Sequence, residues 1–218
     1  MLARAFDRVR EYTHEARIAF LEYQIATLSG DNARAADKAL AWLELEPRNQ
    51  HACSAALIAL GIGEERWAEA VSIAYRIVDE KTDDLVVLNN AAYVLAMSGA
   101  PEAAVEVLES IRADDFIIKA TLGLAYLASN QIDKGMKLYR MAAQDAEKVS
   151  DDSRSLMTCY QALVVRQLGI LNTADMEMLS ALSLPAVALP EDWEDRPEFL
   201  RLYNIAQRHG YGWPLSID

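Results

Sequence analysis

The sequence predicts an all-α fold, a solenoid of about five antiparallel helix hairpins with capping helices at its ends. Of the 218 residues, 52% are hydrophobic, while only 6 are Pro and 9 are Gly. Ala and Leu dominate, and these side chains lose little rotamer freedom in a helix. Small and apolar residues also recur at spacings of three and four, as on one face of a helix. The whole arrangement then returns about every 34 residues, which indicates a repeat protein.

The second helix of each expected hairpin carries three positions at offsets of zero, four and seven. These positions are Ala35, Ala39 and Trp42; Ala70, Ala74 and Ile77; Ala104, Leu108 and Ile111; Gly135, Tyr139 and Ala142; and Ala174, Met178 and Ala181. Such offsets lie on one face of a helix. We expect each second helix to bury this face, with small residues where it crosses its partner helix.

The first helix of each hairpin precedes the second by a nearly constant step. Its first core positions, twelve or thirteen residues upstream, are Tyr23, Leu57, Ala92, Gly123 and Ala162, and three residues later come Ala26, Leu60, Leu95, Tyr126 and Val165. The connecting turns contain Gly30, Gly63, Gly99, Asn130 and Gly169. Gly and Asn tolerate the left-handed conformation that ends many helices, so these residues predict the ends of the first helices.

The segment "TLGLAYLASNQIDKGMKLYRMAA", residues 121–143, shows the pattern most clearly. With Leu122, Gly123, Tyr126, Gly135 and Tyr139 it resembles the tetratricopeptide repeat (TPR). The first, second and fifth units lack the Leu-Gly pair. The resemblance covers residues 16–186 and implies a right-handed superhelix of five repeats, with approximate ranges 16–49, 50–84, 85–115, 116–150 and 151–186.

Both flanks are predicted to be structural. Residues 1–15 are expected to form a helix or cap continuous with the first repeat, and residues 187–218 a loop, a capping helix and an aromatic tail. Pro197 should open this last helix and Gly210 should end it. We expect Tyr211 and Trp213 in the tail to fold back over the last hairpin, the alternative being that they dock into a partner.

In the TPR family the first helices line a concave groove in which partners lie. The family's groove positions correspond here to Arg17, Phe20, Gln24, His51, Ser54, Ile58, Val86, Asn89, Asn90, Tyr93, Ile117, Thr121, Leu124 and Tyr160. Members that grip a carboxylate use Lys, Asn and Arg at such places, but Lys and Arg are missing from the middle repeats. The mixed to apolar lining suits an amphipathic helix or an extended apolar segment. The alternative is that a terminal helix, or tighter superhelical packing, fills the groove from within.

The charge balance restricts the class of partner. Asp plus Glu is 33 and Lys plus Arg is 21, a net charge of −12. Such a surface repels nucleic acid and anionic membranes. We therefore expect a protein or peptide partner that offers an apolar or basic segment, and the apolar faces of the edge repeats also favour a homo-oligomer. Cys53 and Cys159 are expected to be separate buried helix residues, which fits a cytoplasmic location.

The chemistry of the side chains does not predict an enzyme, a metal site or a cofactor. His51 and Cys53 are two apart on a helix, so their side chains diverge around its axis. The acid pairs Asp83–Asp84, Asp114–Asp115 and Asp151–Asp152 precede helices, where carboxylates cap the chain. The leading hypothesis is a non-enzymatic interaction module, scaffold or subunit of a larger assembly. The alternatives are a cytoplasmic chaperone of a secreted or assembly-prone protein, and a hydrolase or metal enzyme that uses the loop carboxylates.

Overall fold

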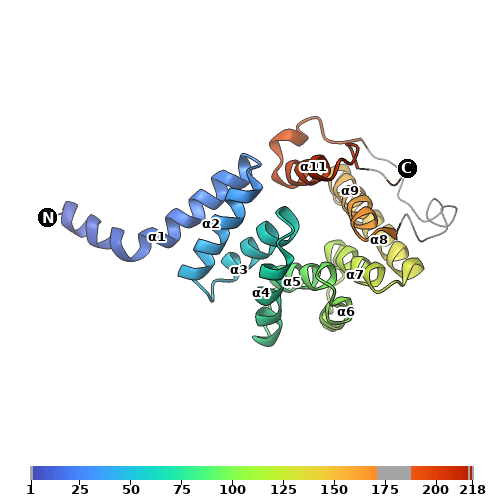
Figure 1. Ribbon diagram of the computed structural model, residues 1–218, viewed down its shortest axis with the longest axis horizontal. Coiled ribbons are helices and arrows are strands. Elements are labelled where there is room, and N and C mark those ends of the chain that lie inside the picture. The colour runs from blue at the N-terminus through green and yellow to red at the C-terminus, as the bar shows by residue number, and fades with distance from the viewer. Residues whose placement is uncertain (1, 171–187, 216, 218) are drawn as a thin grey trace.

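The computed structural model describes residues 2–170, 188–215 and 217, with the backbone alone for residues 2–14. Every regular element in this part of the chain is a helix. In order these are α1 (Leu2–Leu28), α2 (Asn32–Leu45), α3 (Gln50–Ala56) with its π-helical continuation η1 (Leu57–Gly63), α4 (Trp67–Asp79), α5 (Leu85–Met97), α6 (Pro101–Ser110), α7 (Phe116–Ala128), α8 (Ile132–Glu147), α9 (Asp151–Gln167), the short η3 (Trp193–Asp195) and α11 (Pro197–His209). Consecutive helices pack as antiparallel pairs along a curve (Figure 1). The predicted all-α superhelical fold is confirmed.

The starts of the helices follow from capping chemistry. The carboxylate of Asp84 accepts hydrogen bonds from the backbone N–H groups of Val86 and Val87, at 2.9 and 3.1 Å. Asp115 caps α7 in the same way. These bonds satisfy N–H groups that have no partner inside the helix. Two of the three acid pairs therefore contain an N-cap, and the third, Asp151–Asp152, forms the first turn of α9 behind its cap Ser150.

The turns within hairpins use left-handed residues at four of the five expected places. Gly30, Gly99, Asn130 and Gly169 have φ angles of 70°, 91°, 61° and 66°. The prediction for Gly63 is wrong, because this residue is the last of η1 and the left-handed residue is Glu65, with φ 56°. In η1 the N–H of Glu64 bonds to the carbonyl five residues back, at Ala59. This wider turn moves the end of the helix beyond Gly63.

The described repeat positions form one continuous core. All of them are buried except Ile111, the half-buried C-cap residue after α6. At the crossing of α7 and α8, a Cβ added to Gly135 would lie 2.7 Å from the carbonyl oxygen of Gly123. Small residues therefore let these two helices approach closely, as expected. The positions Ala174, Met178 and Ala181, which belong to the second helix of the fifth repeat, lie outside the described residues.

The C-terminal helix runs from Pro197 to His209 and ends at Gly210 with φ 68°, as predicted. It packs on α9 and η3, and it also reaches η1 (Figure 1). The tail folds back, since the ring of Trp213 lies 5.2 Å from that of Trp193 and Leu215 is buried. The predicted cap thus contacts both ends of the curved array.

Candidate partner-binding groove

The concave side of the repeats forms a partly open cavity of about 610 Å³, here called the groove chamber. Nine predicted groove residues line it: Gln24, Ile58, Val86, Asn89, Asn90, Tyr93, Ile117, Thr121 and Tyr160. A second hollow of about 480 Å³ beside it is lined by three others, Phe20, His51 and Ser54, and again by Gln24 and Ile58. The structure therefore brings most of the predicted groove residues to one concave surface.

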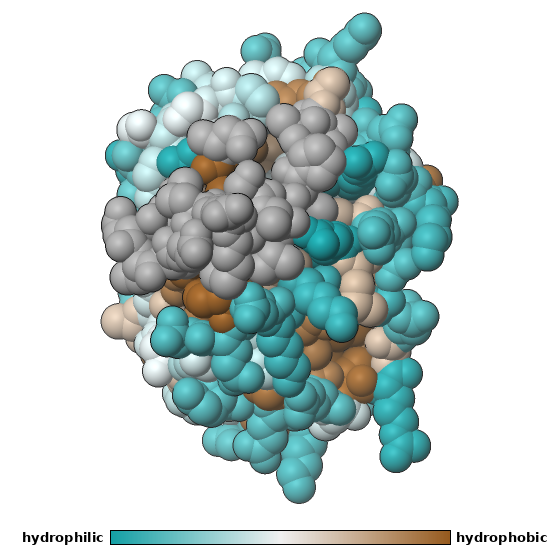
Figure 2. Space-filling model, turned by 90° about the vertical axis from the view of Figure 1, so that its right-hand side faces the viewer, coloured by the Kyte–Doolittle hydropathy of each residue, from teal (hydrophilic) through white to brown (hydrophobic). Residues whose placement is uncertain are grey.

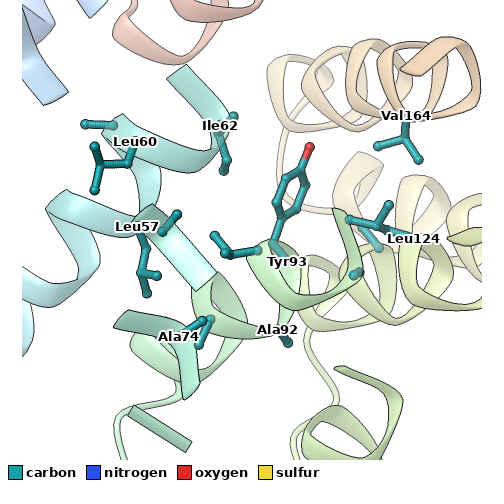
Figure 3. Close-up of a cluster of buried hydrophobic side chains, with 14 of the residues drawn as sticks. Leu57, Leu60, Ile62, Ala74, Ala92, Tyr93, Leu124 and Val164 are labelled. Atoms are coloured by element: carbon teal, nitrogen blue, oxygen red, sulfur yellow. The ribbon is translucent and has the colours of Figure 1, made fainter. Parts of the chain in front are cut away.

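Two predicted groove residues lie elsewhere. Arg17 is exposed on α1 and lines neither hollow. Leu124 has no exposed surface, and it belongs to the buried cluster that includes Tyr93 and Val164 (Figure 3). It lies one helical turn beyond Thr121, where α7 is already covered by its neighbours. A leucine in the core cannot contact a partner, so its assignment to the groove surface is wrong.

Two tyrosines form the back wall of the groove chamber. Tyr93 projects from α5 into the space between Ile62 and Val164 (Figure 3). Its ring meets that of Tyr160 edge-on, with 6.5 Å between ring centroids. Burial raises the pKa of both hydroxyls, while the guanidinium of Arg201 lowers that of Tyr160. Both hydroxyls therefore stay neutral, and each combines an apolar ring with one polar end.

The polar groups of the groove chamber are only partly satisfied. The amide of Asn90 donates to the hydroxyl of Ser54 at 2.8 Å. Thr121 donates to the carbonyl of Ile117 at 3.1 Å. By contrast, Oδ1 of Asn89 and Oγ1 of Thr27 are buried and have no hydrogen-bond partner. Buried polar atoms are usually paired, so these two atoms are exceptions within the described lining.

The alternative expectation, a terminal helix that fills the groove from within, agrees with the structure in part, because α11 lines the groove chamber and leaves about 610 Å³ of it open. Pro197, Glu198 and Arg201 line the groove chamber opposite the repeats, and Arg201 is the one Lys or Arg in its described lining. The sequence contains one signal for this placement. Arg201, Asn204 and Arg208 follow a polar stripe on α11, beside the apolar face formed by Leu202 and Ile205, and a polar stripe can form a second contact surface.

The described residues show neither a metal-ligand cluster nor a membrane-spanning helix. No three His, Cys, Asp or Glu side chains in residues 15–170, 188–215 and 217 gather as ligands of a metal ion would. None of the helices described is both long and apolar enough to cross a membrane. On the face shown in Figure 2, hydrophilic side chains predominate, and hydrophobic ones appear in smaller areas between them.

No protein-family model and no curated protein matches the sequence. Two solved structures are similar. MamA residues 41–end from Desulfovibrio magneticus RS-1 aligns with 18% identity and a TM-score of 0.50, over 73% of this chain and 94% of that one. A MamA RS-1 ArsTM double mutant aligns with 15% identity and a TM-score of 0.51, over 91% and 98%. MamA is a TPR protein, so the likeness shows a TPR fold for this chain.

Proposed function

We propose that this chain is a non-enzymatic interaction module that holds a segment of a protein partner in the groove chamber. The observation that carries the proposal is the lining itself. Apolar walls, the buried ring of Tyr93 and the half-buried ring of Tyr160 line one partly open cavity on the concave side of a TPR-like fold. Apolar surface of this kind favours burial of a partner's apolar side chains.

The partner segment should be short, apolar at its centre and basic at its flanks. A helix is a cylinder about 10 Å across with a pitch of 5.4 Å, or roughly 420 Å³ per turn. The groove chamber, at about 610 Å³, therefore holds one to two turns. The net charge of −12 attracts basic flanks at long range. Cys53 and Cys159 are free, buried thiols, which supports the cytoplasm as the place of action.

A charge placed at the mouth of the groove tests this proposal. Val86 lines the groove chamber and is 63% exposed, so Val86→Glu introduces a carboxylate without disturbing the core. Val149→Glu is the matched control, because Val149 is 68% exposed and lies outside both hollows. Affinity capture with mass spectrometry should show the partner with the wild type and the control, and lose it with Val86→Glu. Equal capture by all three proteins would rule out the groove as the binding surface.

A chaperone is the second candidate, favoured by the apolar mouth of the groove chamber. Val86 and Ile117 are 63% and 46% exposed there, where they could cover an apolar segment of a cargo protein. A chaperone should keep one otherwise insoluble protein in solution on co-expression, and Val86→Glu should abolish this rescue. If the captured partner is soluble alone, a scaffold is the better description.

Participation in a larger assembly is supported by the outer face of α1. Ile18, Leu21, Ile25 and Leu28 are 41–64% exposed and lie at spacings of three and four. Solenoids normally cover the apolar face of a terminal repeat. We do not propose the hydrolase or metal-enzyme alternative, because Asp84 and Asp115 already accept hydrogen bonds as helix caps and Asp152 pairs with Arg196.

A further inference from the structure

The two ends of the solenoid meet at a polar contact between α11 and the first two repeats, here called the seam. The side-chain amide of Asn204 donates to the carbonyl oxygen of Gly30 at 2.8 Å, across 174 residues of sequence. The guanidinium of Arg208 donates to the carbonyl oxygen of Gly63 at 2.6 Å and pairs with Glu64 at 3.2 Å. The repeats and α11 thus surround the groove chamber together.

The acceptors on the repeat side are carbonyl groups at the ends of helices. Gly30 follows α1, and Gly63 is the last residue of η1. A carbonyl in the last turn of a helix, such as that of Gly63, has no N–H partner inside the helix, and cationic side chains bind it well. The carbonyl of Gly30 also accepts the N–H of Asn32 at 3.0 Å. The polar stripe of α11 therefore contacts the helix ends of two adjacent repeats, the first and the second.

The two faces of α11 are attached in different ways. On one face, Phe199, Leu202 and Ile205 are at most 3% exposed, within the contact with α9, η3 and the tail. On the other, the seam consists mainly of partly exposed polar contacts, which include the pairing of His209 with Glu65 at 2.8 Å, while the side chain of Leu200 lies against Gly30. Water compensates for most, but not all, of the strength of such polar contacts, whereas separating the apolar face would expose hydrophobic surface. The seam is therefore the weaker of the two attachments.

The seam also limits the space inside the groove. Arg201 and Pro197 of α11 share a small pocket with Tyr23, Thr27 and Ile58 of the first two repeats. A helix longer than one to two turns exceeds the groove chamber as it stands. Separation of α11 from the first repeats would enlarge the space on this side.

We propose that α11 is a releasable clasp, which holds the solenoid closed at the seam and separates from the first two repeats when a partner helix enters the groove. The partner in this statement rests on the proposed function. The seam itself does not depend on a partner, because α11 and the first two repeats are in contact in the unbound chain. Opening should occur at the polar seam, with α11 remaining on α9.

Spin-label distances across the seam test the clasp without a partner. Ala33→Cys on α2 and Gln207→Cys on α11 place labels at exposed positions on either side, and the native Cys53 and Cys159 are buried. Asn204→Ala/Arg208→Ala removes the seam contacts of these two side chains and leaves the pairing of His209 with Glu65. It should raise the fraction of long distances roughly 5- to 100-fold. The single change Asn204→Ala should give a smaller shift in the same direction.

The control variant is Arg154→Ala, which removes an ion pair with Glu147 away from the seam. It should leave the distances as they are in the wild type. If the seam variants do not change the distances, or if Arg154→Ala changes them equally, the clasp is disproved.

A synthetic 18-residue amphipathic Leu/Lys helix serves as the probe for release. It should shift the wild-type labels to the long distances and bind the double variant more tightly, since that variant has less closing energy to overcome. Binding with no change in distance would contradict release of the clasp. If the probe binds neither protein while the double variant opens, the proposed partner class is wrong and the clasp stands.

Discussion

The contact between Gly123 and Gly135 shows why small residues recur where the helices cross. An added Cβ on Gly135 would lie 2.6 Å from Cγ of Leu127 and 2.7 Å from the carbonyl oxygen of Gly123. The backbone cannot yield as a flexible side chain can. Gly135→Ala should therefore lower the free energy of unfolding by roughly 1–3 kcal/mol, although Ala gains about 1 kcal/mol in helix propensity. Urea denaturation measures the difference.

Gly212→Ala is the matched control for this change. No atom lies within 4 Å of the Cβ position at Gly212, so the free energy of unfolding should stay within about 0.5 kcal/mol of the wild type. A Gly135→Ala protein as stable as the wild type would mean that α7 and α8 are not in close contact at this point.

The ionisation of Asp145 makes the stability of the fold depend on pH. Its carboxylate lies 2.5 Å from Nζ of Lys119 and 2.6 Å from Nζ of Lys148, which together lower its pKa to about 2. A carboxyl group whose pKa is lowered on folding stabilises the protein above its unfolded pKa, near 3.9. That contribution is lost as the pH falls from about 4 to about 2.

Asp145→Asn should accordingly lower the melting temperature at about pH 6 and have less effect near pH 2.5. Thermal unfolding followed by circular dichroism at several pH values gives the melting temperature of the wild type and of Asp145→Asn as a function of pH. Asp79→Asn, a change at an exposed carboxylate near the end of α4, is the control. A difference between wild type and Asp145→Asn that does not vary with pH would contradict the ion pairs with Lys119 and Lys148.

At the scale of one helix, the N-caps explain where the elements begin. Asp84 accepts two backbone N–H bonds at the start of α5, whereas the neighbouring Asp83 is exposed. Asp84→Ala should lower the free energy of unfolding by about 0.5–2 kcal/mol, and Asp83→Ala by less than about 0.5 kcal/mol. Chemical denaturation of the two variants makes the comparison. Equal losses would assign the effect to net charge and not to capping.

Helix ends that carry local signals could be predicted from the sequence. Pro197 and Gly210 mark the ends of α11, and the acids before α5 and α7 mark the starts of those helices. The prediction failed at η1, where Gly63 resembled an ordinary helix end. The apolar run Leu57–Ile62 is equally compatible with an α-helix, so a local pattern could not predict the π-helical pairing of η1.

At the scale of the whole molecule, contacts between residues distant in sequence limit what could be predicted about the candidate groove. The resemblance to the TPR family led to Tyr93, Tyr160 and most other predicted groove residues, and these line the groove chamber because a repeat presents the same face in every unit. Their contact with a partner stays a prediction. The resemblance could not place Arg201 in the groove chamber. That placement requires contacts such as Asn204 with Gly30, and no local pattern encodes a contact between residues 174 positions apart.

Closure at the seam should also change how stability is distributed through the molecule. In an open solenoid each repeat contacts only its neighbours, so a terminal hairpin has one neighbour and unfolds locally most easily. Here the hairpin α1–α2 has α11 as a second neighbour, through Gly30 and Asn204.

Asn204→Ala/Arg208→Ala should therefore speed amide hydrogen exchange in residues 15–45 more than in α5 and α6, which lie within the array. Mass spectrometry gives, for each segment, the ratio of the exchange rate in the variant to that in the wild type, with Arg154→Ala as the control. Equal acceleration in all segments would mean that the seam affects global stability alone, while an unchanged α1–α2 would mean that closure does not stabilise the terminal hairpin.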